Sequence, residues 1–472
     1  MASLHSRREV LRFGVLGAAA VLLASCQPKT VTVEKEVEKE VTRVVEVEKT
    51  VPVKETVVVE KVATPAGPTE KTVRIIMPAW ATGEVPFDRA AREFADLHPG
   101  VKIALQPDFD GWETKVLAMI ASGSLEWSGA GIASSASSSL PRWILTKMIQ
   151  PMDDYMLASK EKGAQDIKTD MLPVLVKAST YEGKFWGLPY SFENISFNWR
   201  TDYFAAVGVT QAPATWDDWM VVAKKVKDWG APQKIIATSF IPDLDASVGA
   251  LIYSALDNPF TDEMLLNWES QEALDALNFY RDLVRGGMTP PHGFDGYYDA
   301  YMAGKLASLQ AQSSRGVWGQ MAFGTDKVVT SPIPTYRKGS GAGTPFWGNC
   351  VALLNKGPDC QEAFDYFVYT MGPQNTAFQT SVIQSGKTPV YQSAYDIITN
   401  NPQFGTYKWM FDMRKQVEHS VPRPFNNYFA IQETFYQKYI VTFVEEGSAM
   451  TAKECADKIL ADSRAEIAKQ KL

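Results

Sequence analysis

The chain has 472 residues, of which 45% are hydrophobic and 11% are aromatic, so it can bury more than one large core. It carries 47 Lys and Arg against 54 Asp and Glu, a net charge of −7. Nucleic-acid binding calls for a basic face, so this balance excludes nucleic acid as an expected partner. After the first 25 residues, no apolar run approaches the roughly 20 residues that a membrane-spanning helix needs.

The first 25 residues have the organisation of a secretory signal. The pair Arg7-Arg8 precedes a short apolar run, Phe13–Ser25, and resembles a twin-arginine export signal. Leu23–Cys26 resembles a bacterial lipobox, in which the cysteine is lipidated and becomes the first residue of the mature chain. We therefore expect an exported protein that Cys26 anchors to the membrane, facing the extracellular or periplasmic side. The alternative is an ordinary secreted protein with a cysteine near its cleavage site.

Residues 26–71 are predicted to form a tether. Valine, glutamate and lysine dominate residues 29–62, and no aromatic residue occurs there. A segment without large apolar side chains cannot fold alone, and its mixed charges keep it solvated and extended. The alternative is a coiled coil or strand that joins copies, but the valine spacing drifts between two, three and four. We therefore expect a tethered monomer, with the tether ending at Pro65–Pro68.

Catalytic and metal-binding motifs are not found. The histidines are scattered, and the sequence has no HExxH, no G-x-S-x-G and no P-loop. The remaining cysteines are Cys350, Cys360 and Cys455, with no CxxC pair and no Cys/His cluster. Cys350 and Cys360 could form a disulfide or remain free, and the sequence leaves both open. We expect no enzyme, no cofactor and no metal.

The predicted elements alternate in type from residue 72 onward. A strand at 72–77, a helix at 87–97 and a strand at 101–105 make a βαβ unit, which implies parallel pairing. The pattern then predicts further helices at 112–122, 140–148, 215–228 and 270–285, a strand at 349–354 and a helix at 361–370. This alternation is typical of an α/β architecture.

Several segments share their order and spacing with one known family. They are Phe94–Ile103, Met148–Tyr155, Tyr181–Tyr190, Phe204–Trp219, Met302–Ala307 and Asn349–Thr370. Together they resemble the extracellular solute-binding proteins of sugar-type ABC importers, the group that includes maltose-binding protein. The match departs at Glu126–Gly131 and Trp199–Asp202, which lie near the cleft or hinge in relatives, so the identity of the ligand does not carry over.

The resemblance implies a periplasmic-binding-protein type II fold: two α/β lobes joined by hinge crossings, with the ligand in the interlobe cleft. It places residues 72–192, with about 348–400, in the N-terminal lobe. It places residues 193–347, with about 401–472, in the C-terminal lobe. Ligands at the carboxyl ends of strands are also what open α/β sheets generally favour.

The resemblance also implies how the protein works. Its first hinge is expected at Pro189 and Ser191–Asn194, its second at Pro345–Trp347, and its third between about 395 and 420. Closure of the lobes over a small solute would be what the membrane subunits of an ABC permease recognise. The expected partners are therefore a carbohydrate, that permease, and the membrane through the lipid anchor.

Candidate ligand contacts follow from what a sugar needs, which is aromatic faces and a few convergent polar groups. The aromatic candidates are Trp80, Trp112, Trp318 and Trp347, with Tyr297-Tyr298 in a predicted loop. By alignment with the family, Glu193 is expected to accept sugar hydroxyls, Tyr428 to stack on a ring, and Asn427 to donate hydrogen bonds. The alternative is that each of these residues packs in a core or a hinge.

Two other readings remain open. The same fold could bind a peptide or a phosphorylated polyol, and Arg315 and Arg423 are then the candidates to hold an anion. A surface-anchored glycoside hydrolase is the enzymatic alternative, and it would need two facing carboxylates.

Overall fold

The computed structural model describes residues 70–79, 81, 86–132 and 136–470. The predicted signal, Cys26, nearly all of the tether and Trp80 lie outside the described residues.

The N-terminal lobe (N-lobe) is built first. Its elements are β1 (Lys71–Met77), α3 (Phe87–Leu97), β2 (Val101–Pro107), α4 (Trp112–Ser122), β3 (Gly129–Ile132), α5 (Ala136–Leu145), β4 (Ile149–Gln150), α6 (Asp153–Ala158), η1 (Ala164–Asp166), α7 (Ile167–Asp170), α8 (Pro173–Ala178), β5 (Thr180–Tyr181) and β6 (Lys184–Phe185). The chain leaves this lobe through β7 (Leu188–Arg200) and comes back through β11 (Phe346–Leu354). It then continues through α15 (Cys360–Met371) and α16 (Thr376–Gln384). The following elements, α17 (Tyr395–Asn400), η4 (Pro402–Tyr407) and α18 (Trp409–Glu418), form an apolar cluster with Val317, a residue of the segment between the two crossings.

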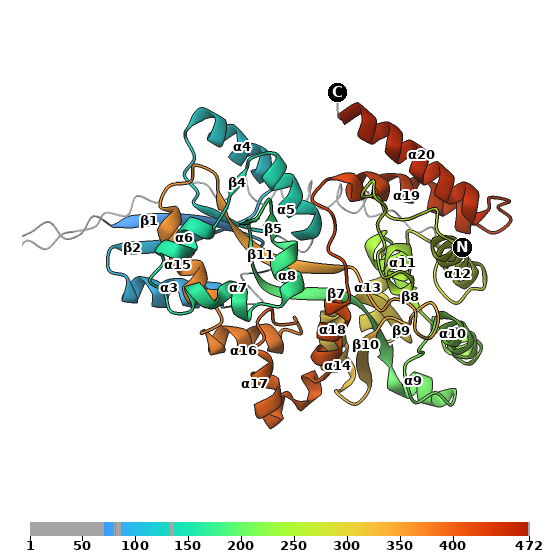
Figure 1. Cartoon of the computed structure of the whole chain (residues 1–472). Coiled ribbons are helices and arrows are strands. Elements are labelled where there is room, and N and C mark those ends of the chain that lie inside the picture. The colour runs from blue at the N-terminus through green and yellow to red at the C-terminus, as the bar shows by residue number, and fades with distance from the viewer. Residues whose placement is uncertain (1–69, 80, 82–85, 133–135, 471–472) are drawn as a thin grey trace, which may run out of the picture. The chain divides into compact units, whose positions relative to one another are not determined.

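The C-terminal lobe (C-lobe) lies between the two crossings in sequence and is completed by the end of the chain (Figure 1). Its elements are α9 (Thr201–Ala206), α10 (Trp216–Gly230), η2 (Ala231–Gln233), β8 (Ser239–Phe240), η3 (Asp245–Gly249), α11 (Ala250–Ala255), α12 (Gln271–Arg285), α13 (Tyr297–Met302), β9 (Ser308–Gln312), α14 (Ser314–Phe323), β10 (Val328–Pro332), α19 (Tyr428–Val444) and α20 (Ala452–Gln470).

One mixed sheet runs through both lobes, in the order β2-β1-β3-β11-β7-β9-β8. The predicted βαβ unit is confirmed, because β1 pairs with β2 in parallel. β7 pairs with β11 over its first half and with β9 and β10 over its second half, all antiparallel. The long strand β7 therefore belongs to both lobes.

The predicted elements agree closely with the structure except at α5. That helix begins at Ala136 and includes Pro141, whereas the apolar pattern placed its start at Leu140. Ser137–Ser139 are weak helix formers, which is why sequence pattern alone missed the first turn. The acidic start predicted for the helix after Thr215 is confirmed as a capping box, in which Thr215 and Asp218 bond each other's backbone N–H.

Each lobe has its own apolar core. The N-lobe core collects β1 residues such as Ile75 together with Phe364 and Phe367 of α15. The C-lobe core collects Trp219 of α10 together with Tyr436 of α19. Both cores therefore combine segments that are far apart in sequence.

The chain passes between the lobes a third time just after α18. Val417 packs in the N-lobe core, and Val421 packs against the C-lobe core. Close to this passage, the amide of Asn194 on β7 donates to Gln416 Oε1 at 2.9 Å. The third crossing thus lies against the first.

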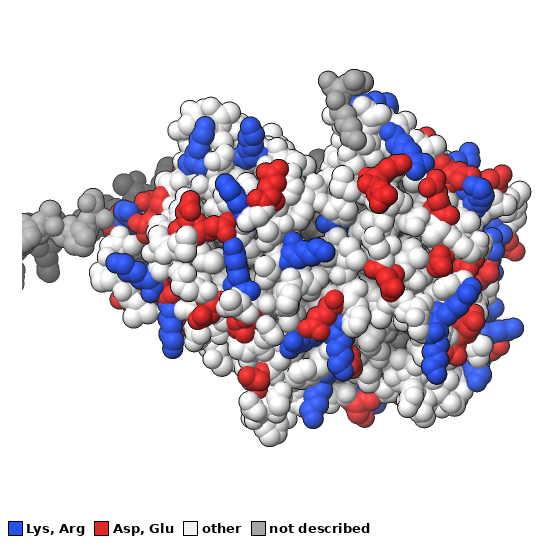
Figure 2. All heavy atoms as spheres, viewed as in Figure 1, with Lys and Arg blue, Asp and Glu red and all other residues white. Residues whose placement is uncertain are grey.

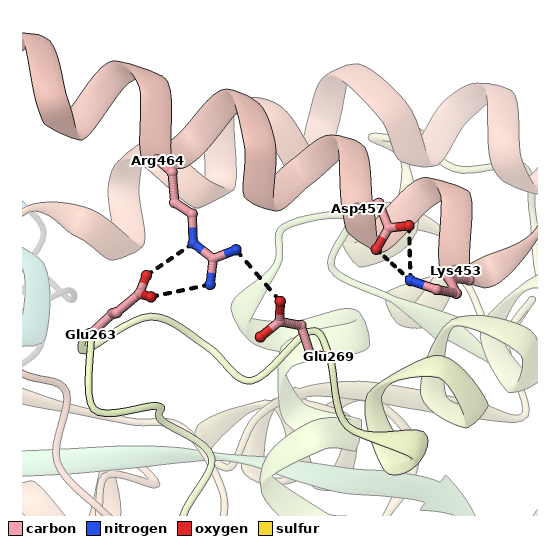
Figure 3. A network of polar contacts seen from close by, with 5 residues as sticks. All are labelled: Glu263, Glu269, Lys453, Asp457 and Arg464. Carbon is pink, nitrogen blue, oxygen red and sulfur yellow. Dashed lines mark hydrogen bonds and ion pairs between the residues drawn. The ribbon is translucent and has the colours of Figure 1, made fainter.

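Helix α20 closes the C-lobe. It packs along α19, and its Arg464 pairs with Glu263 at 2.9 Å and with Glu269 at 3.5 Å, both on the loop before α12 (Figure 3). Lys453 on the same helix pairs with Asp457, one turn further along. Arg464 therefore joins two elements, whereas Lys453 pairs only within α20.

The face shown in Figure 2 carries interspersed basic and acidic side chains, with no broad patch of one sign. No helix in the described ranges combines the length and the apolar character that a bilayer crossing requires.

Candidate functional site

The two antiparallel crossings form a ribbon with two different faces. Trp347 on β11 lies directly opposite Glu193 on β7, and Asn349 lies opposite Ser191. Directly opposed residues point to the same side of a sheet, and so do residues two apart on one strand. These four residues therefore share one face, which we call the polar face. β7 has one extra residue, Tyr190, where the register shifts beyond Asn349.

Glu193 is the only acidic residue on the polar face within the paired stretch of the described strands. Its side chain is buried and accepts a hydrogen bond from the hydroxyl of Ser314, at the start of α14. The amide of Asn349 donates to Ser191 Oγ at 3.0 Å, while its Oδ1 is buried and finds no donor in the described part of the chain. The polar face thus carries a carboxylate held in place and a free amide acceptor.

Trp347 extends this face towards the C-lobe. Its indole Nε1 donates to Asp245 Oδ2 at 3.1 Å, and its ring packs in a small cluster with Ile195 and against Tyr297 and Tyr298. The indole is 5% exposed, so in this conformation it supports the site more than it presents a free face.

Asp245 links the site to a buried group of charges. It forms an ion pair with Arg423 on the third crossing, and Arg423 also lies over the ring of Phe429. Burial lowers the pKa of Arg423 to about 9, although Asp243 and Glu433 act to raise it. Burial raises the pKa of Asp243 to about 7. Arg423 was predicted from the sequence as a candidate for holding an anion. In the structure, its guanidinium already faces carboxylates of the C-lobe.

Arg315 has a different environment. Its Cζ lies 3.6 Å from the ring centroid of Trp318 and 4.5 Å from that of Tyr298. The phenol of Tyr298 donates to Gln312 Oε1 at 2.6 Å. Burial raises the pKa of Tyr298, the guanidinium of Arg315 lowers it, and the carboxylate of Glu193 raises it. Both charges thus act on one phenol, so Glu193, Arg315 and Tyr298 belong to one cluster.

This cluster lies at the carboxyl end of β9, next to the crossings. Gln312 ends β9, and α14 begins two residues later, so Ser314 and Arg315 follow the strand directly. The carboxyl ends of strands are where α/β sheets place their ligands. On the N-lobe side, the loops that follow β1 and β3 include residues 80, 82–85 and 133–135, which lie outside the described residues. The described residues of the site therefore come from the C-lobe and the crossings.

The opposite face of the ribbon carries Phe192, Phe346 and Gly348 together with the amide of Asn194, and it borders a cavity between the lobes. Its empty space measures about 540 Å³, including space open to solvent. Its lining comes from both lobes and all three crossings: Leu140, Pro141, Leu175, Ala178, Ser179, Pro189, Tyr253, Phe346, Gly348, Cys350, Val421, Pro422, Arg423 and Phe425. Residues of both lobes therefore meet around this cavity.

The other residues predicted from sequence lie apart from this cluster or outside the description. Trp112 begins α4 and packs edge-to-face on Trp143 at 5.2 Å between centroids. Asn427 donates to Gln470 at the end of α20 at 2.7 Å. Tyr428 lines a shallow hollow with Met264 and Arg464. Trp80 lies outside the described residues.

Sequence reasoning missed Asp245 and Ser314. Asp245 begins η3, in the segment after the two-residue strand β8, which is too short to give an alternating pattern, so nothing in the sequence marked this segment. Ser314 sits directly after β9, and polar residues at the end of a buried strand are the signal that would have found it.

The sequence left open whether Cys350 and Cys360 form a disulfide, and in the structure both thiols are free. Cys350, Cys360 and Cys455 are unpaired and buried, and burial raises the pKa of Cys350 to about 12 and that of Cys360 to about 11. Among the described residues, no three His, Cys, Asp or Glu side chains are grouped as metal ligands would be.

Comparison with curated proteins gives a partial match. A protein of Brucella abortus described as a binding protein is 22% identical over 215 residues, which is 43% of this chain and 48% of the relative. The chain thus matches about half the length of such curated relatives.

Comparison with solved structures covers most of the chain. The sugar-binding protein MalE from Xanthomonas citri superposes with a TM-score of 0.71 at 16% identity, over 85% of this chain and 98% of that one. An ABC substrate-binding protein from Listeria monocytogenes in complex with cycloalternan gives a TM-score of 0.66 at 16% identity, over 84% and 99%. These likenesses establish the two-lobed, type II periplasmic-binding-protein fold. The sequence pattern of the bacterial extracellular solute-binding proteins matches residues 89–406, and the chain therefore belongs to that family.

Proposed function

We propose that this protein is the lipid-anchored substrate-binding subunit of an ABC importer, and that it captures a sugar or oligosaccharide between its two lobes. The observation that carries this proposal is the polar face of the crossing ribbon. It holds the buried carboxylate of Glu193 at the point where both lobes meet.

The chemistry of this face suits a sugar. A carboxylate accepts hydrogen bonds from hydroxyl groups, and aromatic rings pack on the apolar faces of a pyranose. Glu193 supplies the acceptor, while Trp318 and Tyr298 supply half-buried rings beside it. The Xanthomonas and Listeria relatives are described as sugar-binding and as bound to cycloalternan, which supports the same ligand class here.

Capture would proceed by a hinge motion. Three segments cross between the lobes, and the extra residue Tyr190 on β7 marks a point where ladder pairing is interrupted. The closed form with ligand would then be delivered to the permease, while Cys26 and the tether keep the protein close to the membrane.

Thermal shift and calorimetry on the mature chain test this proposal, with a panel of mono- and oligosaccharides, polyols and peptides. A ligand that binds only the folded state raises the melting temperature. We expect a sugar to do so, and Glu193→Gln to weaken its binding about tenfold or more, because an amide accepts hydroxyl groups less strongly than a carboxylate does. Glu161→Gln, which removes a carboxylate that His98 contacts on the N-lobe, is the control and should keep the affinity.

A shift with peptides or phosphorylated polyols, and with no sugar, would replace sugar by that class of ligand within the same fold. Turnover of a glycoside would instead identify a hydrolase and overturn the binding-protein proposal.

A further inference from the structure

The buried arginines in the described part of the chain are paired with aspartates. The two that are buried in the described part of the chain are Arg200, which pairs with Asp202 at 2.7 Å, and Arg423, which pairs with Asp245. A charged side chain away from water normally has such a partner, because its desolvation is costly.

Arg315 is half-buried and, in the described part of the chain, has no such partner. In the described residues, no carboxylate lies within ion-pair distance of its guanidinium, and its Nε is buried with no hydrogen-bond acceptor. Glu193 acts on the same phenol as Arg315, yet the two residues form no ion pair in the described chain. Glu193 is engaged by Ser314 instead. Arg315 is therefore a positioned cation whose own lobe supplies no anion.

The aromatic neighbours explain how this cation is held. Trp318 and Tyr298 lie against the guanidinium through their rings, and stacking of this kind engages the face of the group. The guanidinium also has a hydrogen bond to the phenol of Tyr298, whereas its Nε–H has no acceptor among the described residues. The edge that carries this Nε–H can therefore bind a planar acceptor. A carboxylate matches that edge with two parallel hydrogen bonds.

We propose that the ligand of this site is an acidic sugar, a uronic acid or an oligosaccharide that contains one, and that Arg315 binds its carboxylate while Glu193 accepts its hydroxyls. This inference rests on the proposed sugar-binding function and names the substrate class. The position of both groups at the carboxyl end of β9 and the adjoining crossing puts them within one ligand's reach.

A carboxylate fits these charges better than a phosphate does. One guanidinium balances the single charge of a carboxylate. A phosphate monoester carries up to two negative charges. The carboxylate of Glu193 is nearby, and no further cation among the described side chains of the cluster would balance the second negative charge.

Calorimetry with matched ligands tests the inference on the mature chain. The probes are glucose and glucuronate, galactose and galacturonate, α-1,4-linked galactobiose and di-galacturonate, and glucose 6-phosphate. We expect at least one uronate to bind about 10- to 100-fold more tightly than its neutral counterpart, the range for a hydrogen-bonded charged group. Arg315→Gln should remove this preference and retain residual sugar binding. Arg337→Gln, which removes an exposed arginine that also stacks on a tyrosine, should leave the preference intact.

Other results decide against the inference in distinguishable ways. Equal or tighter binding of neutral sugars, or a uronate preference that survives Arg315→Gln, overturns the acidic-sugar assignment and leaves sugar capture standing. Tighter binding of glucose 6-phosphate replaces carboxylate by phosphate. Failure of every sugar overturns this inference and the proposed function together. The comparison of ligands on the unmodified chain needs no variant, so it holds even if Arg315→Gln folds poorly.

Discussion

Trp347 and Asp245 join the second crossing to the C-lobe through one hydrogen bond, in which the indole Nε1 donates to Asp245 Oδ2 at 3.1 Å. Trp347 also lies opposite Glu193 on the neighbouring crossing. A rotation of the C-lobe about the crossings would therefore move Asp245, Trp347 and Glu193 as one unit. The carboxylate that we propose accepts the hydroxyls of the ligand therefore lies on the crossing itself.

Loss of this bond should destabilise the fold. Trp347→Phe keeps an aromatic ring but removes the donor and leaves a buried carboxylate oxygen short of one hydrogen bond, which costs about 1–3 kcal/mol. Trp229→Phe is the control, because Trp229 is half-buried and stacks on Tyr203 with no indole bond recorded for it in the described chain. Urea unfolding at constant pH measures both. Equal losses for the two variants would show that the bond to Asp245 contributes nothing particular.

Stability should depend on pH through Asp243. Its pKa is raised from 3.8 to about 7, mainly by burial. The native state therefore holds this proton more tightly than the unfolded state does, so the favourable contribution is full below about pH 4 and is lost as pH rises towards 7. The slope is at most about 1.4 kcal/mol per pH unit.

Asp243→Asn should remove that dependence and become progressively more stable than the parent protein between pH 5 and 7.5. The amide oxygen of the replacement can still accept the bond from the Ala246 N–H. Asp96→Asn, at an exposed position on α3, should leave the profile unchanged. Parallel profiles for the parent and Asp243→Asn would contradict the assignment.

Attachment of α20 should depend on Arg464 rather than on Lys453. Arg464→Ala breaks the pairs to Glu263 and Glu269 that hold the helix to another element (Figure 3). Exposed pairs of this kind contribute about 0.2–1 kcal/mol, and salt weakens them. Hydrogen exchange should therefore rise in the second half of α20 for Arg464→Ala at low salt. Lys453→Ala, which removes a pair within the helix, should leave exchange in that half unchanged.

Cys350 should report opening of the lobes. Its thiol is 1% exposed and lines the interlobe cavity, and burial raises its pKa to about 12, so it should react slowly while the lobes are together. A ligand that favours closure should slow the alkylation of Cys350 further. If the ligand lowers the population of the open form about threefold or more, the alkylation rate should fall by the same factor. Mass spectrometry of iodoacetamide-treated protein locates the label. Cys455, which lies in the C-lobe core, should not respond to ligand, and a matching response there would indicate general stabilisation instead.

Much of the fold was accessible from sequence because its signals are local. The strand at 72–77, the helix at 87–97 and the strand at 101–105 are present, with β1 and β2 parallel. The mixed character of the sheet was not accessible, because β3 and β11 pair across more than 200 intervening residues, and no local pattern records such a contact.

The candidate site was accessible only in part. Glu193 was predicted from alignment with a family, and Trp347 was predicted as an aromatic residue next to an expected crossing. That the two face each other is known only from the register of β7 and β11. Whether an arginine has a carboxylate partner depends on side chains from elements that are distant in sequence. Asp245, for example, forms an ion pair with Arg423. For that reason Arg315 and Arg423 looked equivalent in the sequence and differ in the structure.

The interleaving of the two cores has a consequence for biosynthesis. Ile75 packs in one core with Phe364 and Phe367, and Trp219 packs in the other with Tyr436. A ribosome that has made the first half of the chain has therefore completed neither lobe. Neither lobe can fold as an independent domain early in synthesis. The native state can form only when almost the whole polypeptide has been made. Export before folding would therefore require that a long unfolded chain be kept from aggregating. Export after folding would require that synthesis be complete through the last helix.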